Sequence, residues 1–236
     1  MIKIIAEIGW NHCGDLDLAK KMAKSAQENG ATYAKYQTWS VDRLKPGSWD
    51  DDGRRQIYEK AELGCKEVKI PSFESRNHDL LKYCNKHFDV IFMSTGTSTF
   101  EEIQESCNLI TISSLYLLHC VSSYPCEPKI ANIPRMSALK YINIPFTSTN
   151  IGYSDHIQGV ESAKIAIEFG AQVIEKHFTI DNDLPGRDNK FAILPHDLSN
   201  LSSYIQLRNE MMINHGKDFQ EYELNSRTNY EGRFNG

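Results

Sequence analysis

The sequence predicts an α/β fold of the TIM type, a parallel (β/α) barrel. Short runs rich in β-branched residues alternate with longer stretches of helical pattern, which indicates βα units and a parallel sheet. The length of 236 residues suits one such barrel. Polar residues also follow each expected strand at its carboxyl end, where barrels of this type carry their active sites.

Seven strands are expected, each a short apolar or β-branched run bounded by polar or turn residues. Helices between them are expected from Asp15 to Asn29, where acids lie at the positive end and Gly30 follows the last turn. Further helices are expected at 79–86, 159–170 and 198–213, and Thr99 is a suitable N-cap for another. The strands are Ile2–Ile8, Tyr33–Thr38, Val68–Ile70, Val90–Met93, Leu115–His119, Asn150–Tyr153 and Val173–Phe178.

One βα unit is missing from this pattern. A barrel of this type closes with eight strands, but only one short helical piece, Arg54–Leu63, lies between the second and third expected strands. We therefore expect an α-β-α segment to be absent near Leu63 and Gly64, which leaves an open seam or forces a seven-stranded closure. The barrel is assigned to residues 1–213 and a polar, aromatic tail to residues 214–236.

Composition limits the classes of function. The chain is 40% hydrophobic and 24% charged, as in one globular domain, and its net charge of −5 argues against a nucleic-acid partner. The first apolar run soon meets Glu7, so it is too short for a signal segment or a membrane span. The six cysteines form no C-x-x-C pair and are read as reduced thiols. We therefore expect no membrane partner and a cytoplasmic location.

Two histidines follow neighbouring expected strands, His119 and His156. Their imidazoles can converge across the barrel mouth although they are far apart in the sequence, and imidazole suits Mn. The alternative is a pair of hydrogen-bonded histidines at the rim. His177 and Tyr124 could contact a substrate or make structural hydrogen bonds, and Cys120 is read as buried packing.

Several motifs resemble those of the sialic acid synthase family. They occur in family order over about residues 3 to 210. They are Ala6-Glu7-Ile8-Gly9-Trp10-Asn11-His12-Cys13-Gly14, Lys35-Tyr36-Gln37-Thr38, Lys69-Ile70-Pro71-Ser72, Ser94-Thr95-Gly96, Leu118-His119-Cys120-Val121-Ser122-Ser123-Tyr124-Pro125, Gly152-Tyr153-Ser154-Asp155-His156, Ile174-Glu175-Lys176-His177-Phe178-Thr179 and Leu184-Pro185-Gly186-Arg187-Asp188.

The resemblance implies an enzyme that condenses phosphoenolpyruvate with an N-acylamino-sugar aldehyde. The products would be phosphate and a nonulosonic acid of the N-acetylneuraminic, legionaminic or pseudaminic type, with Mn or Mg as cofactor, in a homodimer. Two features of the family are absent. They are the helix–strand–helix before the expected strand at Val68 and the C-terminal antifreeze-like domain, which leaves the acceptor sugar undecided.

Roles for individual residues follow from the resemblance. His119 and His156 would hold the metal, Glu74 would act as the acid–base residue, and Glu7 would assist at the mouth. For Glu175, an ion pair with Lys176 or Lys35 is at least as good an interpretation as a catalytic role. A phosphoenolpyruvate site needs cations and hydroxyl donors, and acceptor binding falls to the loop after the last strand. The substrate-binding set is Lys35, Lys69, Ser72, Ser94, Thr95, Tyr153, Arg187 and Asp188.

Two other functions remain open at this point. Barrel lysines such as Lys69 or Lys176 could form a Schiff base, as in an aldolase. Alternatively, the loss of a βα unit could leave a non-catalytic relative that only binds a sugar or a phosphate. Borohydride trapping separates the first from a metal-dependent condensation, which a chelator would inhibit.

Overall fold

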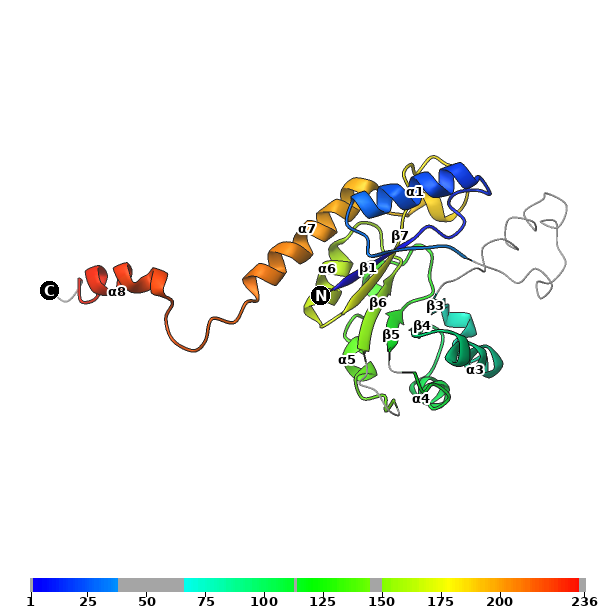
Figure 1. The fold of residues 1–236 in the computed structure, drawn as a ribbon, viewed down its shortest axis with the longest axis horizontal. Coiled ribbons are helices and arrows are strands. Elements are labelled where there is room, and N and C mark those ends of the chain that lie inside the picture. The colour runs from blue at the N-terminus through cyan, green and yellow to red at the C-terminus, as the bar shows by residue number, and fades with distance from the viewer. Residues whose placement is uncertain (1, 38–65, 113, 145–149, 234–236) are drawn as a thin grey trace. The chain divides into compact units, whose positions relative to one another are not determined.

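The computed structural model describes residues 2–37, 66–112, 114–144 and 150–233 (Figure 1). Within them, seven parallel strands form one sheet in the order β2-β1-β7-β6-β5-β4-β3. All seven predicted strands are confirmed, with ends shifted by a few residues. They are β1 (Lys3–Glu7), β2 (Tyr33–Lys35), β3 (Glu67–Ile70), β4 (Val90–Ser94), β5 (Leu115–Cys120), β6 (Asn150–Asp155) and β7 (Val173–His177).

Helices lie around the outside of this sheet, as Figure 1 shows for α1 and for α3 to α6. Each packs a stripe of buried residues inward, as α1 does with Ala19, Met22 and Ala26. Thr99 caps α4 as predicted, through a reciprocal capping box with Glu102. The helices are α1 (Leu16–Glu28), α3 (His78–His87), α4 (Phe100–Cys107), α5 (Arg135–Leu139), α6 (Glu161–Glu168), α7 (Pro195–Met211) and α8 (Leu224–Tyr230), with short turns η3 (Ser72–Glu74), η4 (Pro128–Ile130), η5 (Asp188–Lys190) and η6 (Glu221–Glu223).

The sheet is curled, because its two edge strands reach the same side chain. Lys35 on β2 and Lys69 on β3 both contact Glu175 on β7, with Nζ–Oε distances of 3.4 and 3.0 Å. In a flat sheet β3 would lie about 19 Å from β7, since three strands separate them at about 4.8 Å per step. The fold is therefore a TIM-type barrel with a part missing.

The missing part lies between β2 and β3. Among the described residues neither strand has a second backbone neighbour, and the edges are joined instead by the Tyr33 hydroxyl, 3.2 Å from Glu67 Oε1. In the described part of the chain, the outcome is the open seam, one of the two that the sequence allowed. The expected junction at Leu63 and Gly64, the helical piece Arg54–Leu63 and the predicted end of the second strand at Thr38 lie outside the described residues.

The amino end of the interior is filled, which leaves the carboxyl end for a site. Lys3 Nζ lies 5.5, 6.0 and 5.2 Å from the ring centroids of Tyr33, Phe92 and Tyr116. Below the charged residues, Ile5, Phe92, Leu118 and Val173 form one buried cluster. Polar interior side chains consequently gather above this layer, at the carboxyl ends of the strands.

The described chain divides into two compact units, Met1–Ser203 and Tyr204–Gly236. The first contains the whole sheet, and the second contains the end of α7 with η6 and α8. The sequence-based boundary after residue 213 stays a prediction. No helix in the described ranges has the length and apolar character needed to cross a membrane.

Candidate functional site

Four buried or partly buried charged side chains meet at the carboxyl end of the curled sheet. Glu7 comes from β1, Lys35 from β2, Lys69 from β3 and Glu175 from β7. Lys35 forms ion pairs with both carboxylates, and Lys69 forms one with Glu175. The charges of the two cations and the two anions balance. Three of these residues, Glu7, Lys35 and Lys69, were assigned to the site from the sequence, and the structure brings them together. It also confirms the predicted pairing of Glu175 with Lys35.

The two carboxyl groups of this cluster differ in proton affinity. Burial raises the pKa of Glu7, and the attraction of Lys35 does not cancel that effect. Burial would also raise the pKa of Glu175, but Lys35 and Lys69 together hold it well below its usual range. Glu175 is therefore a fixed negative charge, whereas Glu7 is the carboxylate that more readily accepts a proton.

The two lysines differ in the same way. Burial would lower the pKa of Lys35, but its pairing with Glu175 and Glu7 raises it above the ordinary value. Lys69 is also buried, and there desolvation outweighs the attraction of Glu175, so its pKa is lowered. Lys35 is a permanent cation, and Lys69 is the amine that loses its proton more easily.

Hydroxyl groups and a close-packed main chain lie beside this cluster, on η3 and at the end of β4. The Gly96 amide donates to Ser72 Oγ at 3.2 Å, and a Cβ on Gly96 would lie 2.7 Å from both Ser72 Oγ and Ser122 Oγ. A side chain at position 96 would therefore displace at least one of these hydroxyl groups. Ser94 Oγ is buried and has no hydrogen-bond partner among the described residues, whereas the Thr95 hydroxyl donates to the Leu118 carbonyl at 3.1 Å. Ser72 and Ser94 thus suit ligand binding better than the Thr95 hydroxyl does.

His156 and His177 form a second group, with ring centroids 5.4 Å apart. The Tyr124 ring lies 4.1 Å from His156 and 6.1 Å from His177. His156 Nδ1 donates to the Val121 carbonyl at 2.9 Å, because a carbonyl can only accept, so Nε2 is the nitrogen without a proton when the ring is neutral. Burial opposes protonation of His156, but its contact with Cys120 raises its pKa above the ordinary value. Burial and the neighbouring His156 lower the pKa of His177 well below its usual value, so the His177 ring is neutral.

His119 does not join His156, contrary to the sequence-based expectation. It stacks on Tyr153 with centroids 5.6 Å apart, and its Nε2 donates to the Ala131 carbonyl at 2.7 Å, beside α5. Successive residues of a strand face opposite sides of a sheet. Cys120, the next residue, lies 4.0 Å from His156 Nδ1 at the site, so His119 and its register partner Tyr153 face the helix layer. Neither side chain is brought to the charged cluster.

The remaining predicted residues lie around the rim. Glu74 ends η3, and its Oε2 accepts from Asn77 Nδ2 at 2.7 Å. Asp188 Oδ2 lies 3.8 Å from His177 Nδ1, and burial raises the pKa of this carboxyl group. The Arg187 guanidinium lies 6.0 Å from the centroid of the Tyr124 ring and donates to the main-chain carbonyl of Tyr124 at 3.4 Å. The loop after β7 thus reaches His177 and Tyr124.

The sequence left His177, Tyr124 and Cys120 without a firm role, although all three contact or neighbour His156. A two-residue repeat could have found His177, because it shares a strand face with Glu175. The same repeat places Cys120 at the site in place of His119. Burial would raise the pKa of Cys120, but its contact with His156 lowers it below the ordinary value.

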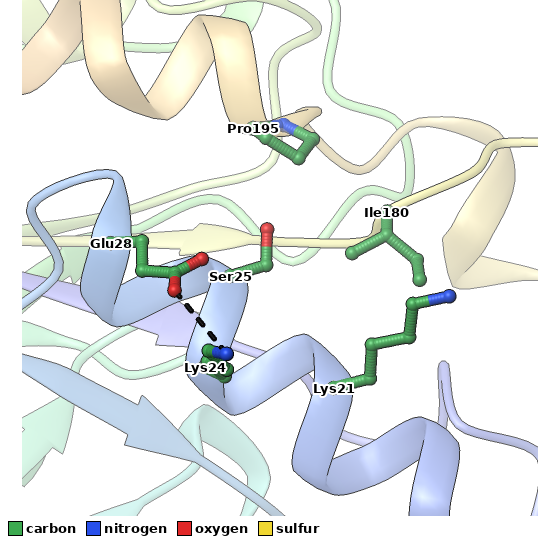
Figure 2. Close-up of a pocket in the computed structure, with 6 residues that line it drawn as sticks. All are labelled: Lys21, Lys24, Ser25, Glu28, Ile180 and Pro195. Carbon is green, nitrogen blue, oxygen red and sulfur yellow. Dashed lines mark ion pairs between the residues drawn. The ribbon is translucent and has the colours of Figure 1, made fainter.

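A hollow of about 370 Å³ on the outside of the barrel is separate from these residues (Figure 2). Its charged members lie along one solvated face of α1, where Lys24 Nζ is 3.7 Å from Glu28 Oε1. None of the predicted site residues lines it. The hollow is lined by Lys21, Lys24, Ser25, Glu28, Ile180 and Pro195.

Among the residues of the site, the imidazoles of His156 and His177 are the side chains most suitable as metal ligands. Within the described ranges, no group of three or more His, Cys, Asp and Glu side chains is arranged to hold one. The His156 ring nevertheless lies beside the neutral His177, and its Nδ1 is fixed by a backbone carbonyl, as metal-bound histidines commonly are. Such a pair fits an open divalent site whose other positions are filled by water or substrate.

Comparison with known proteins places the chain among relatives that share this architecture. The model of the NeuB family matches residues 49–217. The chain belongs to the NeuB family. An N,N'-diacetyllegionaminic acid synthase of Campylobacter jejuni is 31% identical over 86% of this chain and 75% of its own length. A pseudaminic acid synthase of Helicobacter pylori is 27% identical over 98% of this chain and 80% of its own length.

A solved NeuB-type structure agrees with the fold. The N-acetylneuraminic acid synthetase of Leptospira borgpetersenii, solved with citrate, superposes with a TM-score of 0.80 at 27% identity, covering 99% of this chain and 92% of that one. The alignment with the Campylobacter enzyme runs over 255 positions, more than the 236 residues of this chain, although it covers only 86% of them. That relative therefore carries residues inside the matched region that have no counterpart here.

Proposed function

We propose that this NeuB-family chain is an enzyme that condenses phosphoenolpyruvate with an N-acylamino-sugar aldehyde, giving a nonulosonic acid and phosphate. The observation that carries the proposal is the convergence of Lys35 and Lys69 on Glu175 at the mouth of the barrel. Relatives named as legionaminic and pseudaminic acid synthases support the class of reaction.

The charged cluster suits an anionic substrate. Phosphoenolpyruvate carries a phosphate and a carboxylate, and Lys35 and Lys69 offer two cations, with hydroxyl donors at Ser72 and Ser94. Its negative charge adds to those of Glu7 and Glu175. Glu7 can take up a proton at that moment, since burial already raises its pKa, and this keeps the charge of the site balanced.

The reaction joins the methylene carbon of phosphoenolpyruvate to the aldehyde carbon. Water then adds to the resulting cation, and phosphate leaves from the tetrahedral intermediate. Lys35 and Lys69 would offset the negative charge of phosphoenolpyruvate, which otherwise opposes the approach of the two polar substrates. We assign acid–base work to Glu74 and Glu7, and acceptor binding to Arg187 and Asp188 on the loop that reaches His177.

The cofactor we propose is Mn or Mg, held by His156 and His177. When bound, such an ion polarises the carbonyl group of the aldehyde as a Lewis acid. His177 takes the place that the sequence assigned to His119, because it is the imidazole that lies beside His156. The protein contributes orientation here, since the Val121 carbonyl fixes which nitrogen of His156 is available.

The test is phosphate release from phosphoenolpyruvate with a panel of hexosamine-derived aldehydes, with and without a chelator. We expect release that depends on the aldehyde and is lost with chelator. Release without any aldehyde, or no release with every aldehyde and metal, would contradict the proposal. A homodimeric state and a cytoplasmic location are further proposals from the sequence, and light scattering tests the first.

A second candidate is favoured by one observation. Burial lowers the pKa of the Lys69 amine, as in lysines that form Schiff bases. Borohydride reduction in the presence of substrate would trap such an adduct on Lys69. The ion pair with Glu175 opposes the loss of that proton and favours the anion-binding role, so we expect no adduct.

A further inference from the structure

Three successive cross-strand pairs join the ends of β6 and β7. Ser154 and Glu175 are register partners, and the serine hydroxyl donates to Glu175 Oε1 at 2.8 Å. Asp155 and Lys176 are the next partners, and the rings of His156 and His177 follow. Because faces alternate along a strand, the first and third pairs share the site, whereas the middle pair faces the helices.

The middle pair is fully buried and tied to the main chain on both sides. Lys176 Nζ lies 3.1 Å from Asp155 Oδ2 and also donates to the Ile157 carbonyl. Asp155 Oδ1 accepts from the Ile157 amide at 2.9 Å, and Asp155 Oδ2 accepts from Ser162 Oγ, at the start of α6, at 2.6 Å. The exposed fractions of the lysine and aspartate side chains are 2% and 0%.

These contacts fix His156 from both neighbours in sequence. Asp155 precedes it and Ile157 follows it, and Lys176 binds both of them. Lys176 in turn lies between Glu175 and His177. A single ion pair on the outer face therefore connects the two segments that carry the inner histidines.

We propose that Asp155 and Lys176 are positioning residues that hold the imidazoles of His156 and His177 in their relative place. The proposal rests on the proposed function only in assigning metal binding to those two histidines. A buried ion pair is a poor device for stability alone, since an apolar pair of similar volume often serves as well or better. Contacts that orient a ligating histidine are a recognised use of buried polar groups.

The decisive variant replaces both charges, Asp155→Asn with Lys176→Met. Removing the two together avoids leaving one charge unpaired in the interior, which could prevent folding. Imidazole ring shifts, recorded by NMR on the protein without metal or substrate, report the surroundings of each histidine directly. We expect the ring signals of His156 and His177 to shift and broaden together in the double variant, because their relative place is no longer fixed.

A second measurement uses Mn alone, titrated by calorimetry. We expect the double variant to bind Mn about 10 to 100 times more weakly, the usual effect of losing a group that orients a metal ligand. Lys176→Arg keeps a cation and should retain most of the affinity. Ile103→Ala on α4 is the matched control, because it loosens a buried core position away from the histidines.

Unchanged imidazole shifts in a folded double variant would overturn the proposal. An equal change in Ile103→Ala would overturn it too, since the effect would then be a general loosening. The NMR result stands even if the chain proves inactive towards phosphoenolpyruvate. Failure of the proposed function and failure of this inference are thus separable.

Discussion

The two sides of the barrel mouth are built differently. On one side, β6 and β7 are joined by a backbone ladder, and the site residues Ser154 and Glu175 are register partners. On the other side, β2 and β3 face each other across a seam bridged by the Tyr33–Glu67 hydrogen bond, while Lys35 and Lys69 reach over to Glu175. Glu7 and Glu175 therefore lie on strands inside the continuous sheet, whereas Lys35 and Lys69 lie on its two edge strands.

This difference shows where the site depends on side chains alone. Backbone hydrogen bonds fix β6 and β7 whatever their side chains are. The edges β2 and β3 have no such ladder between them among the described residues, so the attraction of both lysines for one carboxylate helps to hold them. Glu175 is thus a structural link as well as a member of the site.

The largest effect should come from Glu175→Gln, which removes that link. Two buried lysines would lose their shared partner, and breaking a buried pair in this way typically costs about 3 to 5 kcal/mol of unfolding free energy. Urea unfolding followed by circular dichroism measures the loss. Glu161→Gln, at an exposed carboxylate that pairs with Lys164, is the control and should change stability by less than about 1 kcal/mol. Equal losses in both would show that the edges do not depend on Glu175.

The histidine assignment comes next in size. His156→Ala and His177→Ala should each weaken Mn binding by about 100-fold or more, because each removes a proposed ligand. The structure turns His119 towards α5, so His119→Ala should keep nearly normal affinity, although the sequence predicted a loss there too. Calorimetric titration of Mn decides between them. Strong loss in His119→Ala with none in His177→Ala would restore the sequence-based pair.

Lys69→Met tests the edge half of the anion site. It removes one charge-assisted contact, which is worth about 1.5 to 3 kcal/mol, or roughly a 10- to 150-fold rise in KM for phosphoenolpyruvate. The KM for the aldehyde should change little. Lys66→Met, at an exposed lysine just before β3, should affect neither constant. A parallel rise in both constants would count against the clamp.

The smallest effect is expected from Tyr33→Phe at the seam. It deletes the hydroxyl that bridges to Glu67 and leaves the ring against Phe92, so stability should fall by only about 0.5 to 1.5 kcal/mol. Thermal or urea unfolding of the variant measures it. Tyr116→Phe keeps the same aromatic layer without touching the seam and is the matched control. If the two variants are equally stable, the bridge contributes nothing to closure.

The sequence by itself determined the class of fold and most of the site. Short apolar runs bounded by polar or turn residues were enough to place all seven strands, because a strand buried in a parallel sheet needs little more than such a run. The strand ends then located Lys35, Lys69, Glu7 and Glu175, since carboxyl ends of parallel strands meet at one end of a barrel. The motifs identified the family that the comparisons show.

Only the tertiary structure decided which side of each strand end faces the site. A shift of one residue turns a side chain to the opposite face, so the choice of Cys120 over His119, or of Ser154 over Tyr153, depends on the register of the strand in the sheet. The sequence likewise could not show that Lys176 pairs with Asp155 on the outer face while Glu175 pairs with Lys35 and Lys69 inside. Pairings across strands depend on register and curvature, which arise only when the whole sheet has formed.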